Sequence, residues 1–162
     1  MTKKRVLLVA VFCSFLFLPH YTAQAAASFA KPNLAGTWFL YITINQMNKE
    51  TGSDPTSYFV QKSACVWGTV SVNKSGVVNS GTTLTYYDYE GGSSLFTVTG
   101  GALIIAKNGV VTGGINVIDS SHQTDTITIA NSKMEPGKKM IAGIVKDAGH
   151  TKSYGMFSAV KR

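Results

Sequence analysis

Eight consecutive residues decide the fold class of this chain: Thr37-Trp38-Phe39-Leu40-Tyr41-Ile42-Thr43-Ile44. Every second side chain is apolar, and the residues between them carry aromatic rings or hydroxyl groups. Side chains alternate across a β-strand, whereas those of a helix return to the same face after three or four residues. The stretch therefore predicts a strand with one aliphatic face and one face of rings and hydroxyls.

The same alternation returns along the chain, and no stretch after the N-terminal region has the spacing of an amphipathic helix. The apolar positions are Val66, Gly68, Val70 and Val72, then Val111, Gly113, Ile115 and Val117, then Ile127 and Ile129, and finally Met140, Ala142 and Ile144. Turn residues separate the runs, as in Lys74-Ser75-Gly76 and Lys107-Asn108-Gly109, where the last glycine suits a left-handed hairpin position. The pattern predicts about eight strands, near 34–44, 58–73, 77–89, 94–106, 109–118, 123–131, 139–146 and 152–161.

Hairpin-short connections follow every strand after the first, which predicts an all-β, antiparallel up-and-down meander. Gly100-Gly101 and Gly113-Gly114 lie inside two of the strands, where glycine marks a bulge or a sharp bend. Bent strands favour a small barrel, closed or partly open, because closure removes the exposed edges of a sheet. An open sheet or a sandwich is the alternative, and either face of the strands is a candidate for the interior.

The N-terminus has the order of a secretory signal peptide. Lys3, Lys4 and Arg5 precede an apolar segment of 13 residues from Val6 to Leu18, and Ala23-Gln24-Ala25 supplies small residues for cleavage. A membrane-spanning helix needs about 20 residues, so the segment is too short for an anchor. We therefore expect a signal peptide over 1–25 and a single domain over 26–162, exported to the periplasm, the cell surface or the medium, with no membrane span after cleavage.

Cleavage after Ala25 changes the charge and the cysteine content. The whole chain of 162 residues carries a net charge of +7, and the 137 residues that remain carry 12 basic and 8 acidic side chains. A balance this small, with lysines spread singly, does not indicate a nucleic-acid surface, and Lys138-Lys139 and Lys161-Arg162 are expected to be solvated charges. Cys65 is left without an intramolecular partner. It is expected to be buried, and the alternative is an intermolecular disulfide.

The segment Asn33-Leu34-Ala35-Gly36-Thr37-Trp38 resembles the G-x-W start of lipocalins and the L-x-G-x-W start of avidins, two families of calycins. It is also similar to exported bacterial β-rich proteins that have no assigned activity. The calycin resemblance implies an up-and-down barrel that holds a small ligand. It further implies that Trp38 plugs the closed end, that Lys161 or Arg162 stacks on it, and that the polar stretch Asn45 to Ser57 forms a loop over the open mouth.

No set of residues has the spacing of a catalytic or metal site. Asp119, Ser120, Ser121, His122 and Asp125 lie in one turn, and Asp88 and Glu90 lie at one strand end, where polar groups are expected without any chemistry. His150 also falls in a predicted turn. We therefore expect no enzyme, no metal and no cofactor.

The aromatic residues are the stronger functional signal. They are Phe39, Tyr41, Trp67, Tyr86, Tyr87, Tyr89, Tyr154 and Phe157. Rings among hydroxyls suit small apolar or aromatic ligands, and the predicted ligand-binding residues are Trp38, Tyr41, Trp67 and Tyr87. The leading interpretation is an exported, non-enzymatic ligand-binding barrel. The alternative is a surface or matrix protein with a packed barrel that assembles through Cys65 or an aromatic patch, and an enzyme is the least favoured reading.

Overall fold

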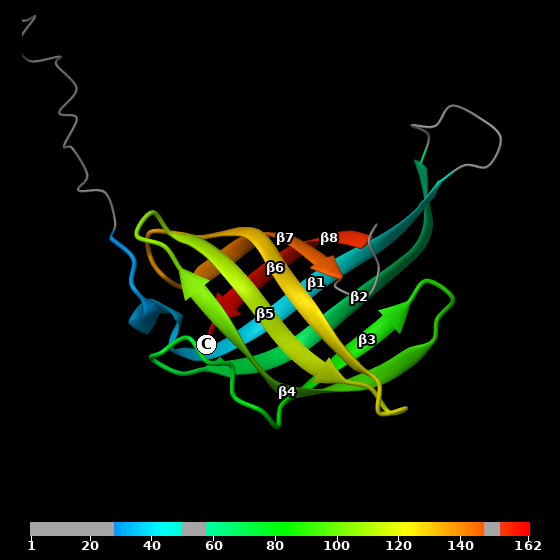
Figure 1. Cartoon of the computed structure of the whole chain (residues 1–162), viewed down its shortest axis with the longest axis horizontal. Coiled ribbons are helices and arrows are strands. Elements are labelled where there is room, and N and C mark those ends of the chain that lie inside the picture. Colours follow the sequence, from blue (N-terminus) through cyan, green and yellow to red (C-terminus); the bar gives the residue numbers. More distant parts are fainter. Residues whose placement is uncertain (1–27, 50–57, 148–152) are drawn as a thin grey trace, which may run out of the picture.

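Eight antiparallel strands close into one barrel in the computed structural model, which describes residues 28–49, 58–147 and 153–162 (Figure 1). A short 3-10 helix, η1 (Lys31–Leu34), precedes them. The strands are β1 (Gly36–Lys49), β2 (Tyr58–Val72), β3 (Thr83–Asp88), β4 (Ser93–Ile105), β5 (Val110–Ile118), β6 (Thr124–Met134), β7 (Met140–Asp147) and β8 (Ser153–Lys161). Each pairs with its sequence neighbour, and β1 pairs with β8 to close the ring. The predicted up-and-down meander is confirmed, and its closed form excludes the open sheet and the sandwich.

Two predicted boundaries differ from the structure by five residues or more. β3 begins at Thr83 rather than near residue 77, because Val77 and Val78 form only isolated bridges with Ala102 and Val72. β1 continues to Lys49 and β2 starts at Tyr58, so part of the stretch expected to be a loop over the mouth is strand. Residues 50–57 lie outside the described residues, as does the whole predicted signal peptide.

Glycines lie where the strands bend and turn, as predicted. The pairing register shifts beside Gly100 in β4 and beside Gly113 in β5, and these shifts mark the bulges. Gly76 and Gly109 have φ angles of 85° and 86°, the left-handed conformation expected of the last residue in each turn.

The aliphatic face of the strands forms the interior. Trp38, Leu40 and Ile42 are almost fully buried, as are the inward residues of β2, β5 and β6. β7 is the exception, because Ile141 and Val145 point inward while the predicted apolar set Met140, Ala142 and Ile144 is exposed. This strand is apolar on both faces, so the pattern assigned it the wrong side.

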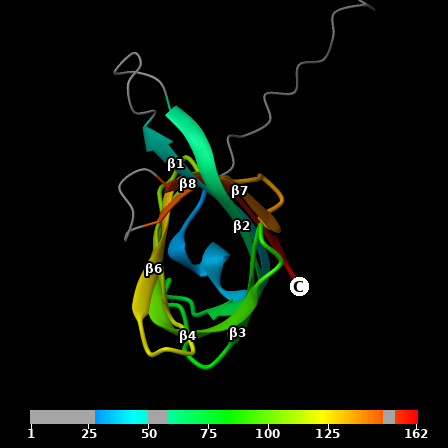
Figure 2. The ribbon, with the colours of Figure 1, turned by 90° about the vertical axis from the view of Figure 1, so that its right-hand side faces the viewer.

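One end of the barrel is sealed by η1 and Trp38, and we call it the closed end. The Trp38 indole donates a hydrogen bond of 2.6 Å from Nε1 to the Leu34 carbonyl oxygen, and Leu34 has no exposed surface. The ammonium of Lys161 lies 5.2 Å from the centre of the Trp38 ring and donates to the Asn33 carbonyl oxygen at 3.1 Å. Trp38 and Lys161 thus lie where the resemblance implied. Figure 2 looks into the opposite, open end, with η1 visible through the ring of strands.

Candidate functional site

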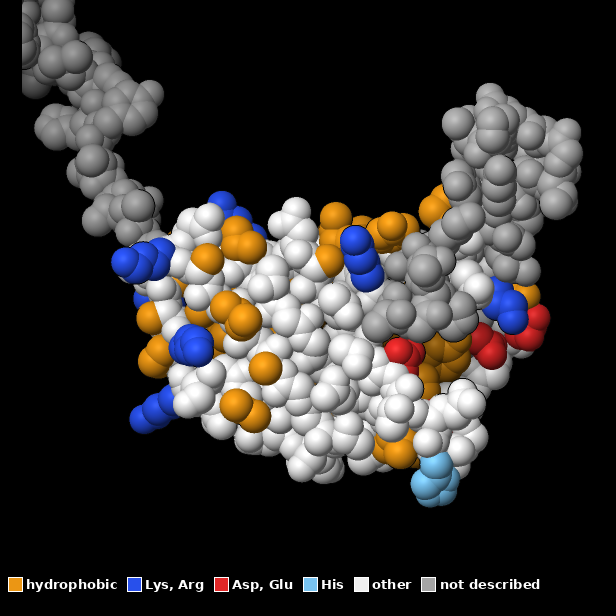
Figure 3. Space-filling model, viewed as in Figure 1, with side chains coloured by type: hydrophobic (Ala, Val, Ile, Leu, Met, Phe, Trp, Pro, Cys, Tyr) orange, Lys and Arg blue, Asp and Glu red, His pale blue; other side chains and the backbone are white. Residues whose placement is uncertain are grey.

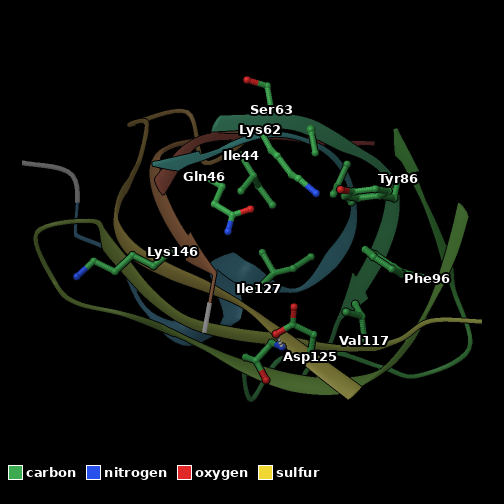
Figure 4. Close-up of a pocket in the computed structure, with 13 residues that line it drawn as sticks. Ile44, Gln46, Lys62, Ser63, Tyr86, Phe96, Val117, Asp125, Ile127 and Lys146 are labelled. Carbon is green, nitrogen blue, oxygen red and sulfur yellow. Dashed lines mark hydrogen bonds between the residues drawn. The ribbon is translucent and has the colours of Figure 1, made fainter. Parts of the chain in front are cut away.

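The open end contains a cavity of about 220 Å³. Its apolar lining comes from six inward side chains on β1 to β6: Ile44, Val66, Tyr86, Phe96, Val117 and Ile127. Its polar rim includes Gln46, Lys62, Ser63, Asp125, Thr126 and Lys146 (Figure 4). We call this space the open-end cavity. It combines an apolar floor with a few polar groups, the usual composition of a small-molecule site.

The cavity exists because the inward side chains change in size along the barrel. Near the closed end the interior is filled by Trp38, Leu40 and Leu84. Toward the mouth, the β2 residue between Val66 and Lys62 in the inward phase is Ala64, which fills little space with its methyl group. Across from it the rings of Tyr86 and Phe96 pack against each other with centres 5.3 Å apart, which holds both against the wall. The barrel is therefore packed solid at one end and hollow at the other.

Lys62 is the rim charge best placed to meet a molecule in the cavity. Its ammonium points into the cavity in Figure 4 and has no ion pair or hydrogen bond with any of the described residues. Asp125 differs, because its Oδ1 already accepts the Thr126 backbone N–H at 2.6 Å. Lys146 points away from the cavity, and its ammonium lies 5.5 Å from the Tyr154 ring centre. Within the described part of the chain, Lys62 is thus a cation without a partner above an apolar floor.

The structure does not bring the four predicted ligand-binding residues together. Trp38 is 1% exposed at the closed end, whereas Tyr41, Trp67 and Tyr87 are 47%, 39% and 42% exposed on the outer wall. Tyr41 pairs with Trp67 across β1 and β2, and Tyr87 pairs with Cys65 across β2 and β3. Of the other aromatic residues singled out in the sequence, Tyr86 and Phe157 pack inside the barrel. None of the four predicted residues lines the open-end cavity.

An apolar surface covers the outer wall of β7, β8, β1, β2 and β3. Besides Tyr41, Trp67 and Tyr87, its exposed residues are Met140, Ile144, Tyr154, Met156 and Val160. We call these eight residues the outer apolar wall. Cys65 lies beside this wall and is half-buried, so the expectation of a buried thiol was wrong. The odd-numbered residues of β2 face outward, because Val66 and Val70 face inward, so the Cys65 thiol lies outside the core.

The carboxylates of Asp119 and Asp88 have structural roles in their turns. Asp119 Oδ1 accepts the backbone N–H groups of Ser121 and Gln123 at 2.9 and 2.8 Å, and His122 has a φ of 66° in the same turn. Asp88 does the same in the turn between β3 and β4, where it accepts the backbone N–H groups of Glu90 and Gly92. Among the described residues, no group of His, Cys, Asp and Glu is arranged to hold a metal ion. His150 lies outside those residues.

The Asp119 turn gives a prediction about pH. Hydrogen bonds from the Ser121 hydroxyl and the Gln123 N–H lower the pKa of Asp119 below its usual range, because they favour the ionised form. A lowered pKa adds stability that is present above the pKa of the unfolded chain and is lost as the pH falls through the folded value. Asp119→Asn should therefore flatten the fall in Tm between about pH 5 and pH 2. Differential scanning calorimetry at stepped pH measures this, and an unchanged slope contradicts it.

Sequence reasoning missed Lys62, although the signal was present. Lys62 and Ala64 continue the inward phase of Val66 and Val70 toward the mouth, so extending the alternation by two steps places a lysine inside the barrel. Phe96 gave a weaker signal, because its strand has mixed apolar and polar residues around a bulge.

Similarity to other proteins adds no assignment. No helix in the described part of the chain has the length and hydrophobicity of a membrane span. No protein-family model, curated protein or solved structure matches this chain.

Proposed function

We propose that this protein is an exported, non-enzymatic, calycin-like barrel that holds a small apolar or aromatic molecule in the open-end cavity. The observation that carries the proposal is the cavity itself, a hollow of about 220 Å³ above the buried side chains of the closed end. Water in such a space meets mostly hydrocarbon, so its replacement by an apolar group is favourable. The signal-like N-terminus supports export to the periplasm or beyond.

The cavity volume sets the size of the molecule. An apolar protein cavity of about 150 Å³ holds benzene, so this one suits a ring with a short chain, roughly ten non-hydrogen atoms. Contacts of that number give a dissociation constant on the order of 0.1 mM. The Lys62 ammonium above the floor favours a molecule whose polar end is a carboxylate, because it has no partner among the described residues.

Filling the cavity should weaken ligand binding. We expect 3-phenylpropanoate to bind the wild type, and Ala64→Phe to weaken its binding at least tenfold because the new ring occupies the cavity floor. Ala102→Phe, on the exposed wall of β4, is the matched control and should bind like the wild type. Isothermal titration calorimetry measures all three, and circular dichroism verifies folding. Equal binding by the two variants contradicts the proposal. So does a wild type that binds no 3-phenylpropanoate and, when purified from its own host, shows no bound small molecule in native mass spectra.

The polar end of the ligand is tested separately at Lys62. Lys62→Gln should weaken 3-phenylpropanoate binding about tenfold, because a hydrogen bond to a charged group contributes about 1.5 to 3 kcal/mol. The affinities of the wild type and of Lys62→Gln for the neutral 3-phenylpropanamide should agree within about twofold, because this compound has no charge that the ammonium could pair with. Titrations of both compounds at pH 7 and equal ionic strength give the comparison. An equal loss for the amide would show that Lys62 shapes the cavity and does not recognise charge.

A second candidate is a surface or matrix protein that assembles through its outer wall. The outer apolar wall favours it, with Met156 74% and Val160 50% exposed, because exposed apolar patches mark contact surfaces. Sedimentation velocity should then show concentration-dependent oligomers that Met156→Lys dissociates. Oligomers that instead disappear on reduction or in Cys65→Ser would assign the assembly to the thiol.

A further inference from the structure

The charged side chains of the barrel are segregated along its axis, which the sequence did not show. Eight of the described cations lie at the closed end, on η1, in three hairpin turns, at the end of β6, and at the end of β8 and of the chain. They are Lys31, Lys74, Lys107, Lys133, Lys138, Lys139, Lys161 and Arg162. Figure 3 shows a group of blue side chains at that end with no red ones among them, whereas the red side chains lie at the other end beside further blue ones. Lysines that are single in the sequence thus converge in space, because every second turn of a meander returns to the same end.

Few negative charges oppose these cations. Among the described residues of the closed end the only carboxylate is Glu135, which accepts the backbone N–H groups of Gly137 and Lys139 at 2.7 and 2.8 Å. At the open end five of the described residues are acidic, Asp88, Glu90, Asp119, Asp125 and Asp147, and three are lysines, Lys49, Lys62 and Lys146. The described part of the barrel is therefore strongly positive at one end and mildly negative at the other.

Most of the closed-end cations are available to a partner. Lys31, Lys74, Lys107, Lys133, Lys139 and Arg162 are exposed, and none of the eight forms an ion pair within the described ranges. Lys161 and Lys138 are half-buried, with their ammonium groups 5.2 and 5.8 Å from the ring centres of Trp38 and Phe29. The exposed cations surround the end of the barrel on separate elements, so together they present a broad positive cap, and Lys107 and Lys133 line an open pocket within it.

We propose that the closed end docks on the anionic surface of a lipid bilayer. Seven of the eight cations are lysines, whose hydrated point charges suit a fluid array of lipid phosphates, whereas bidentate sites for single phosphates favour arginine. Among the aromatic rings nearest the cap, Phe29 and Trp38 are buried beneath cations, and Phe39 is half-buried with the Arg162 guanidinium 5.6 Å from its ring centre, so none of the three is an open platform for stacked bases. A bilayer therefore fits the cap better than a nucleic acid does.

Docking through this end sets the orientation of the barrel. The axis would stand away from the membrane, and the open-end cavity would face the aqueous phase. The inference does not depend on the cavity being occupied, because none of the eight cations lines it.

Vesicle binding tests the proposal with charge-matched variants of the protein purified from its own host. The protein should sediment with phosphatidylcholine vesicles containing 30% phosphatidylglycerol, remain free with phosphatidylcholine alone, and be released as salt rises from about 50 to 500 mM. Lys74→Gln/Lys107→Gln removes two positive charges from the cap and should lower the partition coefficient about 30-fold, at about 1 kcal/mol for each lysine. Ser120→Asp/Gln123→Glu changes the net charge equally at the open end and should stay within threefold of the wild type.

Three results would overturn the proposal. Equal binding to neutral and anionic vesicles would show that charge is not the cause. Equal losses in the two double variants would show that net charge acts without the cap. Tighter binding to a 20-residue oligodeoxythymidylate than to anionic vesicles at the same salt would assign the cap to a nucleic acid instead.

Discussion

Replacing Trp38 with alanine is expected to destabilise the barrel by about 3 to 5 kcal/mol, the usual cost of deleting a buried tryptophan ring. The loss should be at the upper end of that range, because the ring does more than fill space. It is 1% exposed, and its Nε1 holds the Leu34 carbonyl, and so η1, across the closed end. The alanine substitution therefore removes both the ring that fills the closed end and the hydrogen bond that holds η1 over it.

Trp38→Phe separates these two contributions. A phenyl ring restores much of the packing but leaves the Leu34 carbonyl without its donor, so we expect a loss of about 1 to 3 kcal/mol from the hydrogen bond and the missing atoms. Urea unfolding measures both variants, and with a slope of about 2 kcal/mol/M the alanine variant should shift the midpoint by roughly 2 M. Equal losses in the two variants would mean that the plug acts only through the hydrogen bond.

The strands were predictable because their pattern is local. Inward residues of a barrel alternate with outward ones, so the run from Trp38 to Ile44 identified β1 and its buried face without knowledge of any partner. β7 was assigned the wrong face because both of its faces are apolar, and only the closure of the ring tells Ile141 from Ile144. Local periodicity predicts an element, whereas the interior side of an ambiguous strand depends on its neighbours.

The candidate site was less predictable because it is a property of the assembled ring. Aromatic content drew attention to Tyr41, Trp67 and Tyr87, and the structure places these on the outer wall. The cavity is lined by residues of seven strands, β1 to β7, and results from small or displaced side chains, above all Ala64 and the packed pair of Tyr86 and Phe96. A cavity is a space that the side chains of several strands leave unfilled, so the residue pattern of a single strand does not reveal it. The charge cap is similar, since its lysines meet only when alternate turns converge.

The β5 bulge gives the other large expected effect, through Gly113. Its φ is 134°, and a Cβ there would meet the backbone carbonyl oxygen of Ala102 and lie 3.0 Å from the Leu103 Cα on the paired strand. Gly113→Ala therefore combines an unfavourable backbone conformation with a backbone clash that no side-chain rotation relieves, and we expect it to cost about 3 kcal/mol or more.

Gly81→Ala is the control that isolates the clash. Gly81 has a φ of 95°, and a Cβ there meets no atom within 4 Å, so the substitution keeps the backbone penalty and omits the contact. Its expected cost is about 1 to 2 kcal/mol. The difference between the two free energies of unfolding, measured in urea, is then the contribution of the close strand approach at the bulge. Because that approach lets β5 bend between β4 and β6, equal costs for the two variants would mean that the bulge tolerates a side chain and that closure of the barrel does not depend on it.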